Sequence, residues 1–250
     1  MRPLVDELNL LFGRVRHAFE AQKNFVADAA HELRSPLTAL KHQAQTLRRV
    51  DSDPAAREAA ITRLNLGLDR AIRGVEQLLL LAREETGSAQ PASAAPVDLQ
   101  HVVRLAVADT LPQARHKQID LGLADNPPAQ AVPPVSGQLE PLRILLRNLL
   151  ENAVKYTPPG GQVDVSLDLV QGRPVLRVED SGPGIAPENR SRVFDRFFRA
   201  SDAAPQTGSG LGLAIVKAIA ERHGAVLTLG ESARLGGLKV EVRFPPAAPG

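Results

Sequence analysis

Apolar residues recur every three or four positions along the first third of this 250-residue chain. One such stripe comprises Val26, Ala30, Leu33, Leu37, Leu40, Ala44 and Leu47. A second stripe with the same period comprises Ile61, Leu64, Leu68, Ala71, Val75, Leu78 and Ala82. This spacing is typical of helices that pack along one seam. We therefore predict a long helix over residues 3–49 and a second helix over residues 54–86.

The break between these two helices is short. Residues 50–54 read Val-Asp-Ser-Asp-Pro, in which Asp or Ser can cap a helix and Pro54 suits the first helical turn. Two helices joined by so short a turn form an antiparallel hairpin. Because a lone hairpin cannot bury both seams well, we expect a homodimer in which two hairpins make a four-helix bundle.

The pattern changes after a stretch rich in Ala, Ser and Pro at residues 87–96, which we interpret as an interdomain linker. Helical patterns then alternate with strand patterns. We predict helices over residues 99–111, 138–156 and 210–223, and strands over residues 118–123, 163–169, 175–179, 225–230 and 239–244. This order favours an α+β layer with helices on one face of the sheet. The predicted fold class is thus a dimeric helical hairpin followed by an α/β sandwich domain.

Composition excludes several classes of function. The chain has 30 basic and 28 acidic residues, and no basic run with interleaved aromatic residues, which argues against nucleic acid as a partner. The absence of Cys excludes disulfides, thiolate chemistry and Cys-ligated zinc. No stretch reaches the roughly 20 apolar residues of a membrane-spanning helix, and the charged N-terminus is unlike a signal peptide.

His31 is the first candidate for chemistry. It lies off the apolar stripe of its helix and is expected to face solvent, where an imidazole is mostly unprotonated at neutral pH. Glu32 follows directly and can orient the ring or take its proton. A single surface histidine is usually no more than a solvated residue, so the rest of the chain decides its role.

Three short motifs in the second domain bear on that question. The first places Asn148, Asn152 and Lys155 on one predicted helix, with the two amides four residues apart on one face. An amide oxygen is a suitable ligand for Mg²⁺, and an ammonium group can meet phosphate oxygens. Taken alone, this motif is equally well explained as a polar helix face.

The second motif is Asp180 at a predicted strand end, followed by Gly182 and Gly184. Such a carboxylate can accept a hydrogen bond from an exocyclic purine amine, beside backbone that a ligand can approach closely. The third motif is a glycine loop, with Gly208, Gly210 and Gly212 opening a helix, which suits phosphate binding by backbone amides. Neither a Rossmann nor a Walker A pattern is present.

In this order the motifs resemble those of bacterial sensor histidine kinases of the HisKA type, over essentially the whole chain. The segments that resemble the H box, N box, first glycine box, F box and second glycine box are residues 25–40, 148–156, 178–185, 194–199 and 208–213. Residues 3–20 resemble the second helix of a HAMP relay. The resemblance implies a HAMP-like or linker helix at 1–22, a dimerisation and phosphotransfer hairpin at 23–88, a linker at 89–97 and a GHKL-type ATP-binding domain at 98–246.

The resemblance also implies roles for individual residues. His31 would accept the γ-phosphoryl group of ATP, and Glu32 would polarise or deprotonate it. Asn152 would hold Mg²⁺ with help from Asn148, Lys155 would contact phosphate, and Asp180 would bind the adenine amino group. The remaining nucleotide-site residues, which would pack beside the nucleotide or shape the pocket and its lid, are Tyr156, Gly182, Gly184, Ile185, Phe194, Phe197, Gly208, Gly210, Leu211 and Gly212. Arg199 would reach a phosphate or Glu32.

The implied function is autophosphorylation of His31 from Mg-ATP and transfer to an aspartate on the receiver domain of a response regulator. Ser35 stands where many relatives have Thr, and it keeps a hydroxyl for regulator phosphatase activity. The resemblance is strongest to membrane kinases of the QseC and TctE kind, so we expect a cytoplasmic portion of a protein held in the bacterial inner membrane by an N-terminal part absent here.

Two alternatives use the same nucleotide fold. DNA gyrase, MutL and the heat-shock ATPases place a Glu, as a base for water, where this chain has Asn148. A kinase-inactive dimeric scaffold that only senses nucleotide would be favoured by loss of His31, Asn152 or Asp180, and all three are present. We therefore interpret the chemistry as phosphotransfer to His31.

Overall fold

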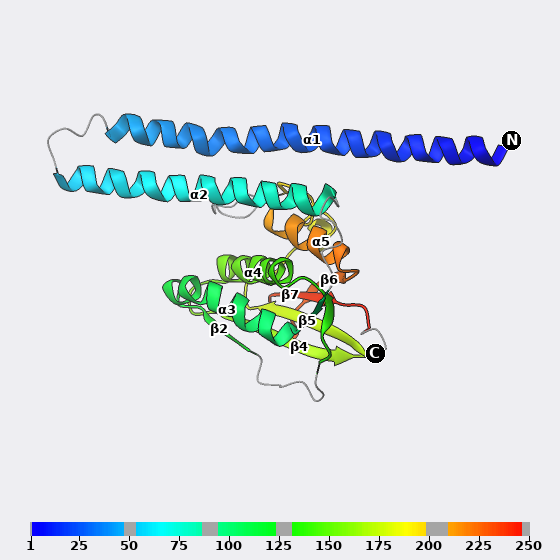
Figure 1. Cartoon of the computed structure of the whole chain (residues 1–250). Helices are drawn as coiled ribbons and strands as arrows, with labels where there is room; N and C mark the ends of the chain where they lie inside the picture. Colours follow the sequence, from blue (N-terminus) through cyan, green and yellow to red (C-terminus); the bar gives the residue numbers. More distant parts are fainter. Residues whose placement is uncertain (1, 48–53, 87–94, 124–131, 199–209, 247–250) are drawn as a thin grey trace. The chain divides into compact units, whose positions relative to one another are not determined.

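The computed structural model describes residues 2–47, 54–86, 95–123, 132–198 and 210–246 (Figure 1). The chain divides into two compact units, Met1–Leu79 and Leu80–Gly250. In the described part of the chain, no helix has the length and apolar character needed to cross a membrane.

Two helices make up the hairpin, α1 over Arg2–Leu47 and α2 over Pro54–Thr86, close to the bounds predicted from the apolar stripes. The helices approach closely at Gly67, where a β-carbon would lie 2.8 Å from Oε1 of Gln43 and 3.0 Å from Cδ2 of Leu40. Many large apolar side chains of the single hairpin remain exposed, among them Phe12, Val15, Phe19, Leu37, Leu68 and Val75. Such exposure is the pattern expected of a hairpin whose seam is completed by a second chain.

The second unit is built on a five-stranded sheet with the strand order β2-β4-β5-β7-β6. Strand β2 runs parallel to β4, and the other neighbouring pairs are antiparallel. The strands are β2 at Asp120–Leu123, β4 at Gln162–Val170, β5 at Arg173–Asp180, β6 at Val226–Glu231 and β7 at Leu238–Arg243. The predicted β4–β5 hairpin is confirmed, with Val163 paired opposite Asp180.

A separate two-stranded sheet pairs β1 at Ala95–Val97 with β3 at Val135–Gly137. The sequence analysis placed residues 95–97 in the linker and predicted no strand at residues 135–137, and the structure instead pairs the two segments in this sheet. Residues 95–97 carry no alternation from which a strand could have been recognised. They become a strand because β3, almost forty residues later, supplies the hydrogen-bond partners.

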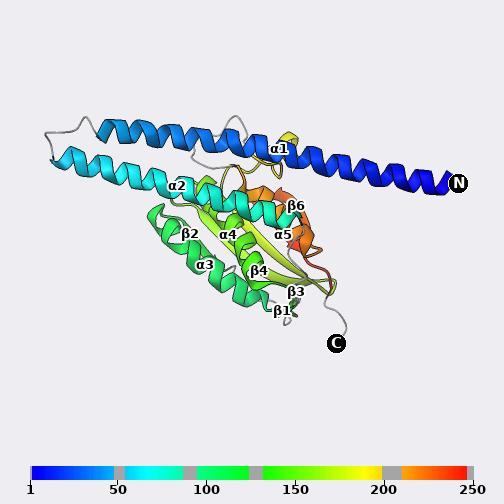
Figure 2. The same cartoon turned by 45° about the horizontal axis from the view of Figure 1, so that its top comes forward.

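Three helices cover one face of the larger sheet (Figure 2). They are α3 at Leu99–His116, α4 at Leu139–Tyr156 and α5 at Gly212–Arg222, with α4 contacting both of the others. Their apolar faces pack against one face of the sheet, and this core includes Leu145, Leu146, Leu150, Val154, Val163, Val165, Leu176, Ile215, Ile219 and Val242. The layered arrangement predicted from the order of helices and strands is therefore confirmed.

Helix α3 is longer than predicted, because it continues through Pro112 to His116. Proline interrupts a helix by removing one hydrogen bond and crowding the preceding turn. Here, burial of Thr110 and Ala114 on either side of Pro112 stabilises the helix across the interruption. The extension brings the next residue, Lys117, to the C-terminal end of α4.

Candidate active site

The two asparagines of α4 meet the beginning of α5. Asn148 is buried, and its Nδ2 donates to the carbonyl of Ile144 at 2.8 Å, while its Oδ1 lies on the side of Gly212. A β-carbon on Gly212 would lie 3.2 Å from Oδ1 of Asn148 and 3.3 Å from Nδ2 of Asn152. Both amide groups therefore lie against the first residue of α5, where even a β-carbon would make a tight contact with them.

Helix α5 begins without a side-chain cap, since its N-cap residue is the buried Leu211. The first N–H groups of a helix lack intrahelical partners and carry the positive end of the helix dipole. The amide groups of α4 and the start of α5 thus form one polar corner, to which a phosphate group is suited.

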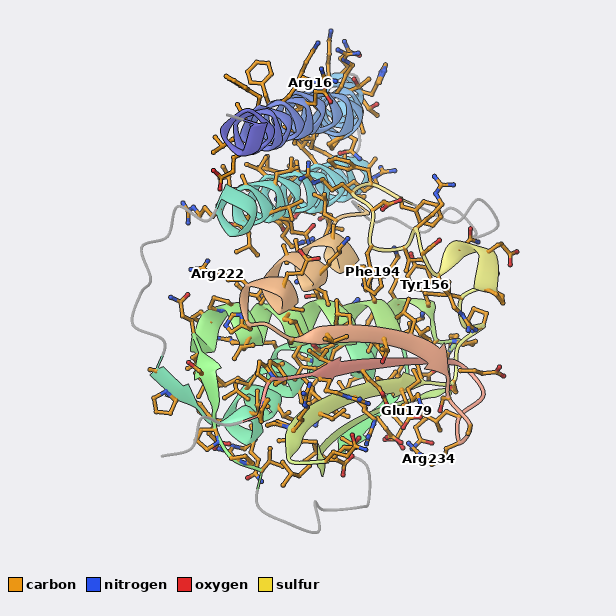
Figure 3. The ribbon with its side chains drawn as sticks, turned by 90° about the vertical axis from the view of Figure 1, so that its right-hand side faces the viewer. Arg16, Tyr156, Glu179, Phe194, Arg222 and Arg234 are labelled. Carbon is orange, nitrogen blue, oxygen red and sulfur yellow. The ribbon has the colours of Figure 1, made fainter. Side chains whose placement is uncertain are left out.

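Lys155 and Tyr156 end the same helix. The Nζ of Lys155 lies 3.1 Å from the Tyr156 hydroxyl and 4.6 Å from the centre of its ring. Tyr156 remains 40% exposed, and Figure 3 labels it. This pair presents a cation and an aromatic face together at the end of α4.

Asp180 is the last residue of β5 and is buried. Its Oδ1 accepts hydrogen bonds from the backbone N–H groups of Gly182 at 2.9 Å and Leu238 at 3.1 Å. Burial raises the pKa of Asp180, while the two N–H donors act in the opposite direction. Because both hydrogen bonds fall on Oδ1, Oδ2 is the oxygen that can accept from a ligand.

Glycine is required at two places around these groups. Gly184 has a φ of +71° in the loop that follows β5. Gly210 has a φ of +70°, and a β-carbon there would lie 2.8 Å from the Cα of Phe197. The N–H of Phe197 donates to the carbonyl of Gly210 at 3.0 Å, so backbone atoms join the segments that resemble the F box and the second glycine box.

Comparison with known proteins decides the family. Residues 137–248 match the family described as histidine kinase-, DNA gyrase B-, and HSP90-like ATPase, and residues 21–87 match the His Kinase A (phospho-acceptor) domain. The sensor protein QseC of Escherichia coli (strain K12) is 42% identical over 245 residues, which cover 98% of this chain and 52% of QseC. A solved structure of the mycobacterial sensor histidine kinase MprB is 34% identical with a TM-score of 0.53, and the match covers 60% of this chain and 97% of that one.

The chain belongs to the sensor histidine kinases. It spans about half the length of the curated relatives it matches. The histidine kinase ThkA, solved in complex with the response regulator protein TrrA, has the same fold, with a TM-score of 0.72 at 20% identity over 93% of this chain and 64% of that one.

The kinase's candidate phosphoacceptor lies on α1. Residues His31, Glu32 and Ser35 fall within this helix, but their side chains lie outside what the structure describes. Arg199 and Gly208 also lie outside the described residues. The structure therefore brings together the nucleotide-site residues of α4, β5 and α5, and the assignments of these five residues stay predictions.

The backbone at residues 237–238 was missed by the sequence analysis. A β-carbon on Gly237 would lie 2.5 Å from Oδ1 of Asp180, and the next N–H, that of Leu238, is one of the two donors to that oxygen. The pair Gly236-Gly237 between two strand patterns is a turn signal. Nothing in the local pattern says that this turn lies on Asp180, because the two residues are more than fifty positions apart.

The residues of this site suit a nucleotide with its metal ion. Gly212 and Gly237 lie where any β-carbon would crowd the side chains of Asn148, Asn152 and Asp180, so the site is built around polar groups kept clear of side-chain bulk. Within the described residues no group of three His, Asp or Glu side chains could hold a metal by itself. A Mg²⁺ ion bound through an amide oxygen of Asn152 would take its other ligands from phosphate and water, as Mg²⁺ does in other phosphate sites.

Proposed function

We propose that this chain is the catalytic part of a sensor histidine kinase, which transfers the γ-phosphoryl group of ATP to His31 and then to an aspartate of a response regulator. Membership of the family supports this proposal. The observation that carries it is the contact of Asn148 and Asn152 with Gly212 at the beginning of α5.

The site divides the recognition of ATP between its two ends. Oδ2 of Asp180 would accept a hydrogen bond from the exocyclic amine of adenine, and Tyr156 would pack beside the nucleotide. Lys155 and the first N–H groups of α5 would bind the phosphates. Asn152, with Asn148 beside it, would hold the Mg²⁺ ion, which neutralises the charge of the phosphates when bound.

In the transfer step a ring nitrogen of His31 would attack the γ-phosphorus. A nitrogen–phosphorus bond forms, the bond to the bridging β,γ-oxygen breaks, ADP leaves, and Glu32 takes the proton of the imidazole. Apart from His31, the protein forms no covalent bond in such a reaction, so catalysis comes from in-line positioning of the reactants and from charge neutralisation. An amide cannot activate water as a base, so Asn148 does not support an ATP hydrolase of the clamp kind.

The remaining assignments follow from the same proposal. Residues 23–88 would dimerise and present His31 to the ATP-binding domain at residues 98–246, and residues 1–22 would be a HAMP-like helix. The regulator's aspartate would take the phosphoryl group from His31, and the hydroxyl of Ser35 would orient a water that hydrolyses the phosphorylated regulator and releases phosphate. The full-length protein would be held in the bacterial inner membrane by an N-terminal part.

Labelling with [γ-³²P]ATP and Mg²⁺ tests the proposal. We compare the parent with His31→Gln, Asn152→Ala and, as a matched control, His42→Gln, which changes an exposed histidine of the same helix. We expect an acid-labile, base-stable label on the parent and on His42→Gln, and none on the other two variants. Label that persists on His31→Gln would overturn the phosphoacceptor, and ATP binding without any label would favour a nucleotide-sensing scaffold.

A further inference from the structure

The turn between β6 and β7 is closed by one buried side chain, that of Ser232, which is 1% exposed. Its Oγ accepts a hydrogen bond from the N–H of Leu235 at 3.0 Å. Its backbone N–H donates to the carbonyl of Gly237, and its carbonyl accepts from the N–H of Gly236, each at 2.8 Å. Ser232 therefore holds both ends of the turn over residues 232–237.

The same hydroxyl ties this turn to strand β5. The Oγ of Ser232 donates to Oε1 of Glu179 at 2.8 Å, and Glu179 directly precedes Asp180. A second tie is an ion pair between Arg234 of the turn and the buried Asp164 of β4. Figure 3 labels Glu179, near the end of β5, and Arg234 of the turn.

The far end of the turn lies directly on Asp180. A β-carbon on Gly237 would come within 2.6 Å of the backbone nitrogen of Gly182 and 2.5 Å of Oδ1 of Asp180. The N–H of Leu238 donates to that same Oδ1. A shift of the turn by a fraction of an ångström therefore changes the hydrogen bonding of Asp180.

We propose that Ser232 is a positioning residue for nucleotide binding: its hydroxyl holds the turn against Glu179, so that the N–H of Leu238 stays on Oδ1 of Asp180 and Oδ2 is presented to the purine amine. This inference rests on the proposed function, because it assumes that Asp180 recognises the base. In this proposal Ser232 acts through Glu179 and the N–H of Leu238, and not by contact with the nucleotide.

A positioning role for Ser232 would shift the pH dependence of nucleotide binding, whereas a purely structural role would leave it unchanged. Asp180 must be ionised to accept from the amine, and burial already raises its pKa. Losing the Leu238 donor removes one of the two groups that lower this pKa. As the pH is lowered, Ser232→Ala should therefore lose nucleotide binding at a higher pH than the parent does.

The experiment is calorimetric titration of the full chain with the non-hydrolysable analogue AMP-PNP and Mg²⁺ between pH 5 and pH 8. We expect Ser232→Ala to bind about tenfold more weakly at neutral pH, as loss of one buried hydrogen bond implies. We also expect the loss of its affinity on acidification to occur at a higher pH than in the parent. The matched control Ser166→Ala, which changes a half-buried serine of β4 near Asp168, should bind like the parent at every pH.

A second variant approaches the same hydrogen bond from its other end. Glu179→Ala should weaken binding in the same direction, and Ser232→Ala in that background should add less than twofold, because the two residues act through one contact. If Ser232→Ala alone fails to fold, Glu179→Ala by itself still tests the contact, because it removes the acceptor of the same hydrogen bond. Additive losses, or a Ser232→Ala variant with the affinity and pH profile of the parent, would overturn the inference while His31 labelling of the parent still stands. A parent that does not bind AMP-PNP would overturn the proposed function and this inference together.

Discussion

Gly212 and Asn148 lie so close that a β-carbon on the glycine would stand 3.2 Å from Oδ1 of the asparagine. The residues belong to α5 and α4, and they are more than sixty positions apart in the chain. The contact places the beginning of one helix on the amide face of the other. A side chain at Gly212 would therefore crowd the two amide groups.

Substitution of Gly212 tests this contact. We expect Gly212→Ala to weaken AMP-PNP binding about fivefold, as mild overpacking costs about 1 kcal/mol, and Gly212→Val to weaken it much further. Gly122→Ala is the control, because a β-carbon there meets nothing within 4 Å. Calorimetric titration measures the affinities, and equal binding by parent and Gly212→Val would show that α5 does not enclose the ligand.

Asp180→Asn should separate stability from binding. Burial raises the pKa of Asp180, so the folded protein holds this proton more tightly than the unfolded chain. Asp180 therefore contributes its full stabilisation below the ordinary aspartate pKa of 3.8. This contribution is lost as the pH rises through the higher pKa of the folded protein. At neutral pH the ionised group destabilises the nucleotide-free fold.

We therefore expect Asp180→Asn to unfold at a higher urea concentration than the parent at pH 7.5 without nucleotide. Its affinity for AMP-PNP should fall about a hundredfold or more, since an amide N–H would face the purine amine. Urea unfolding and calorimetry measure the two effects. A variant that is less stable than the parent at this pH would contradict the burial argument.

Lys117 caps the C-terminal end of α4. Its Nζ donates to the carbonyl of Val154 at 2.9 Å and to the carbonyl of Lys155, in the last turn where helix carbonyls lack partners. We expect Lys117→Met to lower the free energy of unfolding by about 1–2 kcal/mol, with Lys117→Arg less affected. It should also weaken AMP-PNP binding, because Lys155 and Tyr156 lie at this helix end.

The matched control for that measurement is Lys217→Met, which changes an exposed lysine of α5 paired with Glu221 at 4.0 Å. Exposed pairs of this kind contribute little to stability. Urea unfolding of the three variants gives the comparison. Equal losses for Lys117→Met and Lys217→Met would mean that the cap contributes nothing specific.

Arg143 and Asp109 join α4 to α3 through two hydrogen bonds of 2.8 Å each. The hydrogen bond from Arg143 lowers the pKa of Asp109, so the contribution of this pair is present above the ordinary aspartate pKa of 3.8 and is lost as the pH falls through the lowered folded value. This dependence is opposite in sign to that of Asp180.

We expect Asp109→Asn to be less stable than the parent at pH 7.5, and the difference to shrink as the pH approaches and passes below 3.8. Asp195→Asn is the control, because its pair with Arg192 is 3.9 Å long and exposed on both sides. Urea midpoints measured across this pH range test the sign. A difference that stays constant with pH would argue that the two residues act only through packing.

Much of the fold is predictable because its signals are local. The apolar stripes of α1 and α2 and the alternation in β4 and β5 each reflect burial of one face of a single element. Sequence reasoning misjudged the extent of α3 beyond Pro112 and missed the paired strands at residues 95–97 and 135–137, which depend on contacts with distant segments.

The sequence by itself determined the two-part organisation, the order of the motifs and the presence of residue types suited to phosphate, purine and metal, because these are properties of short segments. Only the tertiary structure decided that Gly212 lies on the amides of α4, that Lys117 caps that helix and that the turn closed by Ser232 rests on Asp180. Each of these contacts joins residues far apart in the chain. Distances of that kind are set by packing of the whole domain, and no local pattern records them.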